Sequence, residues 1–305
     1  MKKIDFFILG AQKCGTTSLF YYIKDHPHIC MSDPKEVVYF SRDETYAKGE
    51  SYLNQFFHQC NKAEKLGTAD VRLLTSTRAP QRVHAYNPNA RLIVCLRDPV
   101  ERAFSAYWMA IRNGWEYSRI TFEEAMNREL NSDHQADENL PENAFHRHYI
   151  RNGLYYTQMQ KWLQYFGEDN IMLIRDDSLK ENTTKVLKDL FTFIDVDPDF
   201  EPDTTKKYNT VANPRFSFIN TFIAGNKQLR ATLGRIIPKT FKRKITRPLV
   251  KKIYNWNNVP SDYPAELDVE TKNKLEAIFR NDLDQLYKKY GIDVPRRNYT
   301  HSNRC

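Results

Sequence analysis

Ile4-Asp-Phe-Phe-Ile-Leu-Gly-Ala-Gln-Lys-Cys-Gly-Thr-Thr-Ser-Leu19 is the stretch of sequence that decides the fold. Its apolar first half predicts a buried strand over Asp5–Leu9, and its second half predicts a helix over Thr16–Asp25. A strand that runs through a glycine loop into a helix is typical of a phosphate-binding loop, because the free N–H groups of the first helical turn attract anions. The stretch therefore predicts an anion site within an α/β fold.

This loop departs from the pattern of nucleotide-hydrolysing enzymes. Gly10 and Gly15 keep the G-x-x-x-x-G spacing, but Thr16 stands where that pattern has lysine, and the lysine is Lys13, inside the loop. The loop thus lacks the lysine and hydroxyl pair that holds a triphosphate with its magnesium, which predicts a nucleotide ligand without ATP hydrolysis. The residues expected to bind the anion through N–H, hydroxyl or ammonium groups are Lys13, Cys14, Gly15, Thr16, Thr17 and Ser18.

A second segment, Arg91-Leu-Ile-Val-Cys-Leu-Arg-Asp-Pro-Val-Glu-Arg-Ala-Phe-Ser-Ala-Tyr107, predicts a strand over Leu92–Leu96 and a helix over Pro99–Arg112. Asp98 is a suitable N-cap for that helix, and proline suits its first position. Arg97 then lies at the carboxyl end of a strand, where open parallel sheets bind ligands. A guanidinium there and the hydroxyl of Ser105 suit a phosphate monoester. The alternative is that Arg97 only pairs with a neighbouring carboxylate and that Ser105 only fills space.

Together the two segments resemble the sulfotransferases that use 3′-phosphoadenosine 5′-phosphosulfate (PAPS). The resemblance implies that residues 13–18 bind the 5′-phosphosulfate and that Arg97 and Ser105 bind the 3′-phosphate. It extends over most of the chain, through Asn152–Tyr155, Ile171–Leu179 and the helix expected over Leu275–Tyr290. It implies a central, mainly parallel sheet flanked by helices.

The resemblance is to the bacterial and Golgi-type carbohydrate branch, because Asp33-Pro-Lys-Glu-Val-Val-Tyr-Phe40 looks like that branch's glutamate-containing segment. It implies that Glu36 is the catalytic base and that Lys13 neutralises the leaving group in an in-line sulfuryl transfer without a metal. The alternative for Glu36 is an exposed loop carboxylate beside Lys35. The segment Gly67-Thr-Ala-Asp-Val-Arg-Leu-Leu74 departs from relatives, which often have Ser/Thr-Pro-x-Tyr there, so acceptor contacts are not inferred from it.

Composition sets further limits. The 305 residues, 41% hydrophobic, suffice for one large domain over 1–305, and the net charge of +8 favours an anionic ligand. Seven of the cations lie in residues 239–252, for which a lid, a track for a sulfated glycan and a solvated surface segment stay open. The close pair His146 and His148 is expected at the surface. Helices over Tyr52–Gln59 and Thr183–Ile194 and a strand over Ile171–Ile174 complete the predicted scaffold.

The cysteines predict the compartment. Their odd number and irregular spacing indicate neither a zinc site nor a disulfide framework, which favours a reducing cytoplasm; they are Cys14, Cys30, Cys60, Cys95 and Cys305. Cys14, inside the anion loop, is expected to have a lowered pKa. The apolar run at Ile4–Leu9 is too short for a signal peptide or a membrane anchor. We therefore expect a soluble cytoplasmic enzyme.

Two other classes of protein stay open at this point. One is a small-molecule kinase that uses ATP, against which stands Thr16 at the lysine position. The other is a basic protein that binds nucleic acid, against which stands the lack of any helix-turn-helix, zinc or base-stacking motif. For the favoured sulfotransferase, the acceptor is expected to be a hydroxyl or an amine of a small molecule, such as an alkaloid or another natural product, or of a sugar.

Overall fold

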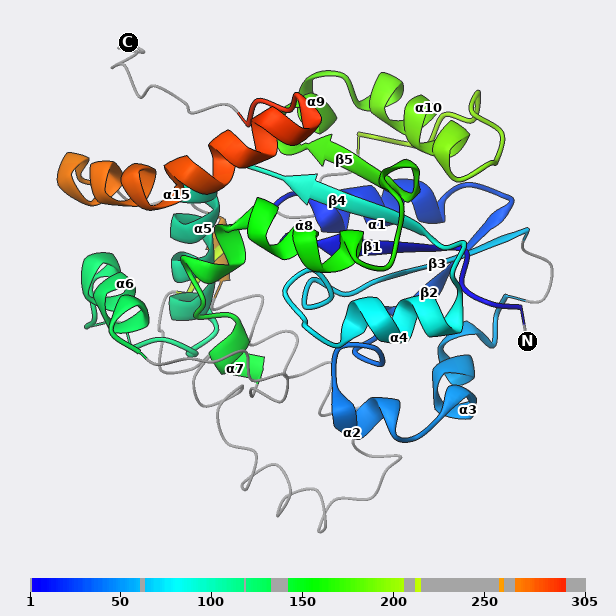
Figure 1. Ribbon diagram of the computed structural model, residues 1–305, viewed down its shortest axis with the longest axis horizontal. Helices are drawn as coiled ribbons and strands as arrows, with labels where there is room; N and C mark the ends of the chain where they lie inside the picture. Colours follow the sequence, from blue (N-terminus) through cyan, green and yellow to red (C-terminus); the bar gives the residue numbers. More distant parts are fainter. Residues whose placement is uncertain are drawn as a thin grey trace.

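The computed structural model describes residues 2–60, 64–117, 119–132, 142–205, 212–214, 258–260 and 267–294. A five-stranded parallel sheet in the order β2-β3-β1-β4-β5 forms its centre (Figure 1). The strands are β1 (Phe6–Gly10), β2 (Ile29–Glu36), β3 (Lys65–Ala69), β4 (Arg91–Leu96) and β5 (Ile171–Arg175). A short antiparallel pair, β6 (Ala212–Pro214) with β7 (Asn258–Pro260), is separate from it.

Helices cover both faces of this sheet, with α1 on one face and α4 and α8 on the other (Figure 1). The longer helices are α1 (Thr16–Lys24), α4 (Ala79–Tyr86), α5 (Pro99–Arg112), α6 (Phe122–Leu130), α8 (Tyr155–Leu163), α10 (Thr183–Phe193) and α15 (Val269–Tyr290). The shorter ones are α2 (Asp43–Tyr46), α3 (Glu50–Asn54), η1 (Gln55–Phe57), α7 (Glu142–Phe145), η2 (Arg151–Gly153), η3 (Glu168–Asn170) and α9 (Asp176–Glu181). The predicted parallel α/β architecture is confirmed.

Strand β1 lies at the centre of the core, with all five residues buried. Its neighbour β3 approaches it closely at Gly67, where an added Cβ would lie 2.1 Å from Cζ of Phe6 and 2.6 Å from the sulfur of Met31. Only glycine fits there without displacing these side chains. This requirement breaks the apolar pattern of β3, and the strand was not evident from the sequence.

The helices predicted over Thr183–Ile194 and Leu275–Tyr290 each bury an apolar face. In α10, Leu187, Leu190 and Phe191 are in the core. In α15, the buried apolar residues are Leu275, Phe279, Leu283 and Leu286. The spacing of the apolar residues in this helix also predicts Tyr287 as a core residue, and this is wrong because 57% of it is exposed.

Two carboxylates, one buried and one partly buried, fasten helices to the rest of the domain. Asp282 of α15 accepts hydrogen bonds from the backbone N–H groups of Tyr156 and Thr157, both at 2.9 Å, at the N-terminus of α8. Glu129 of α6 accepts from three consecutive N–H groups, those of residues 149–151, at 2.6 to 2.9 Å. Each carboxylate satisfies donors that would otherwise be buried without partners.

The expectation that the cysteines form no disulfide is wrong. Cys30 of β2 is bonded to Cys60, which follows η1, with the two Cα atoms 5.6 Å apart. The pairing joins residues that no sequence spacing pointed to, while Cys14 and Cys95 are free and buried. Disulfides persist mainly in oxidising compartments, so the cysteines no longer support a reducing one. The cytoplasmic location stays a prediction.

Cys305 and the basic stretch 239–252 lie outside the described residues. Helix α6 begins with a capping box that joins Thr121 to Glu124. Within the described ranges, no helix combines the length and the apolar character needed to cross a membrane.

Candidate active site

The polar side chains gather where the strands end. Because all five strands are parallel, the segments that follow them open at one edge of the sheet, the edge at which such sheets bind ligands. Charged residues at or just after these strand ends include Lys13, Glu36, Asp70, Arg72, Arg97 and Asp176. Lys13, Glu36 and Arg97 were predicted as site residues, whereas Asp70, Arg72 and Asp176 were not.

The anion loop has the predicted form. Helix α1 begins at Thr16 after Gly15, whose φ of 79° is left-handed and suits glycine. A Cβ at Gly15 would lie 2.8 Å from Oδ1 of Asp176, so the second glycine also provides room for this carboxylate. As the N-cap, Gly15 has no side chain to satisfy the first-turn N–H groups of α1, which suits them to an external anion.

Lys13 lies in the loop among other cations. Burial, then the charges of Arg112 and Arg97, lower the pKa of Lys13 to about 8. Its own φ of 68° is also left-handed, an uncommon conformation for lysine. A bound anion would offset the repulsion among these cations, so the loop is suited to negative charge.

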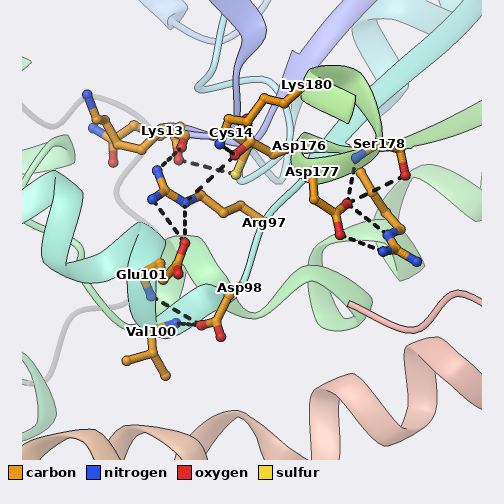
Figure 2. A network of polar contacts seen from close by, with 12 residues as sticks. Lys13, Cys14, Arg97, Asp98, Val100, Glu101, Asp176, Asp177, Ser178 and Lys180 are labelled. Atoms are coloured by element: carbon orange, nitrogen blue, oxygen red, sulfur yellow. Dashed lines mark hydrogen bonds and ion pairs between the residues drawn. The ribbon is translucent and has the colours of Figure 1, made fainter. Parts of the chain in front are cut away.

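Arg97 joins the two predicted donor segments. Its Nη1 lies 3.5 Å from the carbonyl oxygen of Lys13 (Figure 2). Its Nε and Nη2 each lie 3.0 Å from the carboxylate of Glu101. Although burial opposes it, the carboxylates of Glu101 and Asp176 raise the pKa of Arg97 above its ordinary value. The alternative pairing with Glu101 is therefore real, and it coexists with contact to the loop.

The backbone of Arg97 is also held. The hydroxyl of Tyr155 donates to the Arg97 carbonyl oxygen at 2.8 Å and lies 3.6 Å from Sγ of Cys14. Burial raises the pKa of Cys14 to about 11, so the expected lowering is wrong: the thiol is fully buried, and desolvation outweighs the nearby cations. Ser105, on α5, is 2% exposed.

Glu36 is the last residue of β2 and is not on a free loop. The pairing of β2 with β3 shifts between Met31 and Glu36, so that Glu36 lies opposite Ala69. Its Oε1 is 3.0 Å from Nζ of Lys35, and its Oε2 is 3.8 Å from Nη1 of Arg72. With 34% of its side chain exposed, the carboxylate is fixed by two cations and still reaches solvent.

The strand order fixes the spacing between the two halves of the site. Strand β3 separates β2, which carries Glu36, from β1, which leads into the Lys13 loop. Two strand spacings amount to about 10 Å at the sheet edge. That span leaves room for a transferred group and an acceptor between the anion loop and the carboxylate.

A buried polar network contacts the loop through Gln12, and no sequence motif predicted it. Nε2 of Gln12 lies 2.6 Å from Nδ1 of His146. Oε1 of Gln12 accepts hydrogen bonds from Arg102 at 3.3 Å and from Asn152 at 3.4 Å. The His146 ring stacks on Trp115 with centroids 4.4 Å apart. The expectation that His146 and His148 lie at the surface is wrong, because both are buried.

Comparison with known protein families identifies the class of this protein. A family model for the sulfotransferase domain matches residues 3–286, so the chain belongs to the sulfotransferase family. The family transfers a sulfuryl group from PAPS, and the predicted enzyme class and donor are confirmed for this domain. The N-terminus of α1, Lys13 and Arg97 suit the two anionic ends of that donor. The kinase alternative is not favoured.

Individual relatives are distant. The chain is 24% identical to the membrane-associated sulfotransferase kil1 of Dictyostelium discoideum, with 76% of this chain and 65% of that protein covered. It is 27% identical to the mouse bifunctional heparan sulfate N-deacetylase/N-sulfotransferase 4, over 83% of this chain but only 29% of that protein. The mouse heparan sulfate glucosamine 3-O-sulfotransferase 5 is 24% identical, with 84% and 73% covered. Two of these relatives are heparan sulfate sulfotransferases, in agreement with the predicted resemblance to the carbohydrate-type branch.

A solved structure agrees with the fold. The crystal structure of a sulfotransferase from Alicyclobacillus acidocaldarius superposes with a TM-score of 0.66 at 22% identity, over 96% of this chain and 98% of that one. The likeness extends over nearly the full length of both chains, so their folds agree.

Proposed function

We propose that this domain transfers the sulfuryl group of PAPS to a hydroxyl or an amine of a sugar or a small molecule, with Glu36 as general base and Lys13 at the leaving group. One observation carries the proposal. An anion loop and a carboxylate held by two cations lie at the same edge of the sheet, one strand apart.

The reaction is an in-line displacement at sulfur. The acceptor oxygen or nitrogen forms a bond to sulfur while the bond from sulfur to the bridging phosphate oxygen breaks. Glu36 takes the proton of the acceptor, and 3′-phosphoadenosine 5′-phosphate leaves with its new negative charge facing Lys13 and the N-terminus of α1. Positioning and charge stabilisation dominate such transfers, so no metal is assigned a role.

The acceptor class is supported by the named relatives, two of which are heparan sulfate sulfotransferases. Because the chain spans less than two thirds of kil1 and of the bifunctional enzyme, the substrates of the whole protein are part of the proposal. The proposed function does not involve nucleic acid. A cytoplasmic location remains a proposal, against which the disulfide between Cys30 and Cys60 counts.

The donor half is tested by isothermal titration with 3′-phosphoadenosine 5′-phosphate and, separately, with ATP and magnesium. We expect tight binding of the bisphosphate, weakened about 30-fold or more in Arg97→Ala, because a buried charge pair is broken. Arg91→Ala is a matched control, since this arginine is at the opposite end of β4 and bonds the carbonyl of Asp169. Preference for ATP with magnesium, or full affinity in Arg97→Ala, would contradict the assignment.

The acceptor is then sought by following bisphosphate release from PAPS against a panel of glucosamine-containing saccharides, phenols and small amines. Turnover that depends on one of these compounds identifies its class. Release that no compound on the panel accelerates would contradict the proposed acceptor class while leaving the donor site intact.

A further inference from the structure

The segment Gly67–Leu74, which departs from the pattern of relatives, forms a buried ionic pair at the end of β3. Asp70 is fully buried and Arg72 is 6% exposed. Oδ1 of Asp70 accepts from the backbone N–H of Arg72 at 3.0 Å and lies 3.5 Å from its Nη1, and the Ser41 hydroxyl donates to Oδ2. The guanidinium lies over the ring of Phe145, 5.1 Å from its centroid. Arg72 is thus held from several sides.

The same guanidinium reaches Glu36. Its Nη1 is 3.8 Å from Oε2 of Glu36, and Lys35 lies 3.0 Å from the other oxygen, so each carboxylate oxygen faces its own cation. Arg72 is therefore shared between two carboxylates of different environment. Asp70 is buried and Glu36 reaches solvent, so only the latter can meet a substrate.

The charged groups around Glu36 form a set of two cations and two carboxylates. With both carboxylates ionised, Lys35, Glu36, Asp70 and Arg72 have no net formal charge. A proton taken up by Glu36 leaves the group with one positive charge, formed while the leaving bisphosphate gains negative charge. Burial raises the pKa of Asp70 above its ordinary value, and the charge of Arg72 opposes this shift, so the arginine favours the ionised form of Asp70.

We propose that Arg72, fixed by Asp70 and Phe145, is a positioning residue that orients the Glu36 carboxylate toward the acceptor. The inference rests on the proposed role of Glu36 as base. The segment Gly67–Leu74, which differs from the pattern of relatives, thus supplies the arginine that fixes the proposed base. Because Arg72 is anchored by Asp70, it keeps its place when Glu36 becomes neutral, and the site is ready for the next turnover.

The test is a double-mutant cycle on kcat with the acceptor found above, or on the rate of single-turnover bisphosphate release. Arg72→Gln is expected to lower kcat roughly five- to a hundredfold, as coupled neighbours do, with KM for PAPS changed less than about threefold. In a Glu36→Gln background the same substitution is expected to change kcat less than about twofold. Arg72→Lys, which keeps the charge but not the fork, is expected to recover part of kcat.

Folding is controlled for in two ways. The double variant Asp70→Asn/Arg72→Gln leaves no buried charge unpaired and is expected to show the same loss of kcat. Arg82→Gln is the matched control, because Arg82 is 13% exposed, pairs with Asp43 and lies 4.4 Å over the ring of Tyr46 without a bond to Glu36. Its kcat is expected to stay within about twofold.

The outcomes separate the two proposals. An equal loss in the wild-type and Glu36→Gln backgrounds, or a loss confined to KM, overturns the positioning role of Arg72. Normal turnover in Glu36→Gln alone overturns the base assignment, whatever Arg72 does.

Discussion

The two halves of the candidate site are built differently. The donor half, after β1 and β4, is made largely by the main chain, since the N-terminus of α1 and the loop before it supply the N–H groups, and Arg97 reaches the loop through a carbonyl oxygen. The acceptor half, after β2 and β3, is a network of side chains around Glu36. A backbone site needs a short contiguous motif, whereas a side-chain network can be rebuilt with other residues. The donor half is therefore easier to recognise.

The largest expected effect separates these halves directly. Lys13→Ala and Glu36→Gln should each lower kcat, the second by about a hundred- to ten-thousandfold, as loss of a general base does. Only Lys13→Ala should also weaken binding of 3′-phosphoadenosine 5′-phosphate in isothermal titration. If Glu36→Gln weakened that binding equally, the two halves would not be distinct.

The next effect concerns the disulfide of Cys30, near the start of β2, the strand that ends at Glu36. A bond closing a loop of about 30 residues contributes about 3 to 4 kcal/mol in the chain-entropy view. Cys30→Ser/Cys60→Ser should lower the free energy of unfolding in urea by this order, and kcat more than bisphosphate affinity, because β2 carries Glu36. Counting maleimide-reactive thiols under denaturing conditions should give two more after reduction. An unchanged count would show that the bond does not form.

The smallest expected effect concerns the pH dependence of donor binding. The pKa of Lys13 is about 8 in the free protein, and a bound anion favours the protonated form. Affinity for the bisphosphate should therefore be level below pH 8, where Lys13 is already charged, and fall by up to about tenfold per pH unit above it. Titrations from pH 7 to 9.5 measure this slope. In Lys13→Arg, whose side chain is charged over this whole range, the affinity should not depend on pH. A pH dependence that persists in this variant would show that another group takes up the proton.

Sequence patterns predicted the donor half because its determinants are local. The apolar runs of β1 and β4, the glycines of the loop and the cap at Asp98 each act on neighbouring residues, and these elements form where expected; the cap accepts from Val100 and Glu101. The acceptor half was predicted only at Glu36, through resemblance. Strand β2 contains Ser32, Asp33 and Pro34, residues that are typical of a turn. The apolar pattern of β3 is interrupted by Gly67.

The remaining site residues depend on contacts between distant parts of the chain. Arg72 meets Glu36 only because β2 and β3 are paired, and Gln12 meets His146 across 134 positions. Cys30 of β2 is joined to Cys60, which follows η1, across 30 positions. No periodicity or spacing encodes such contacts, since they follow from the order of strands in the sheet.

The bond from Asp282 to the start of α8 has a consequence for synthesis of the protein on the ribosome. Tyr155, the first residue of α8, holds the carbonyl of Arg97, and the next two residues depend on Asp282, more than 120 positions later. Within this domain the P-loop-like anion loop is translated well before α15, so its support is complete only after α15 has emerged. A nascent chain that stops short of this helix would carry the anion-binding motif without a finished binding site.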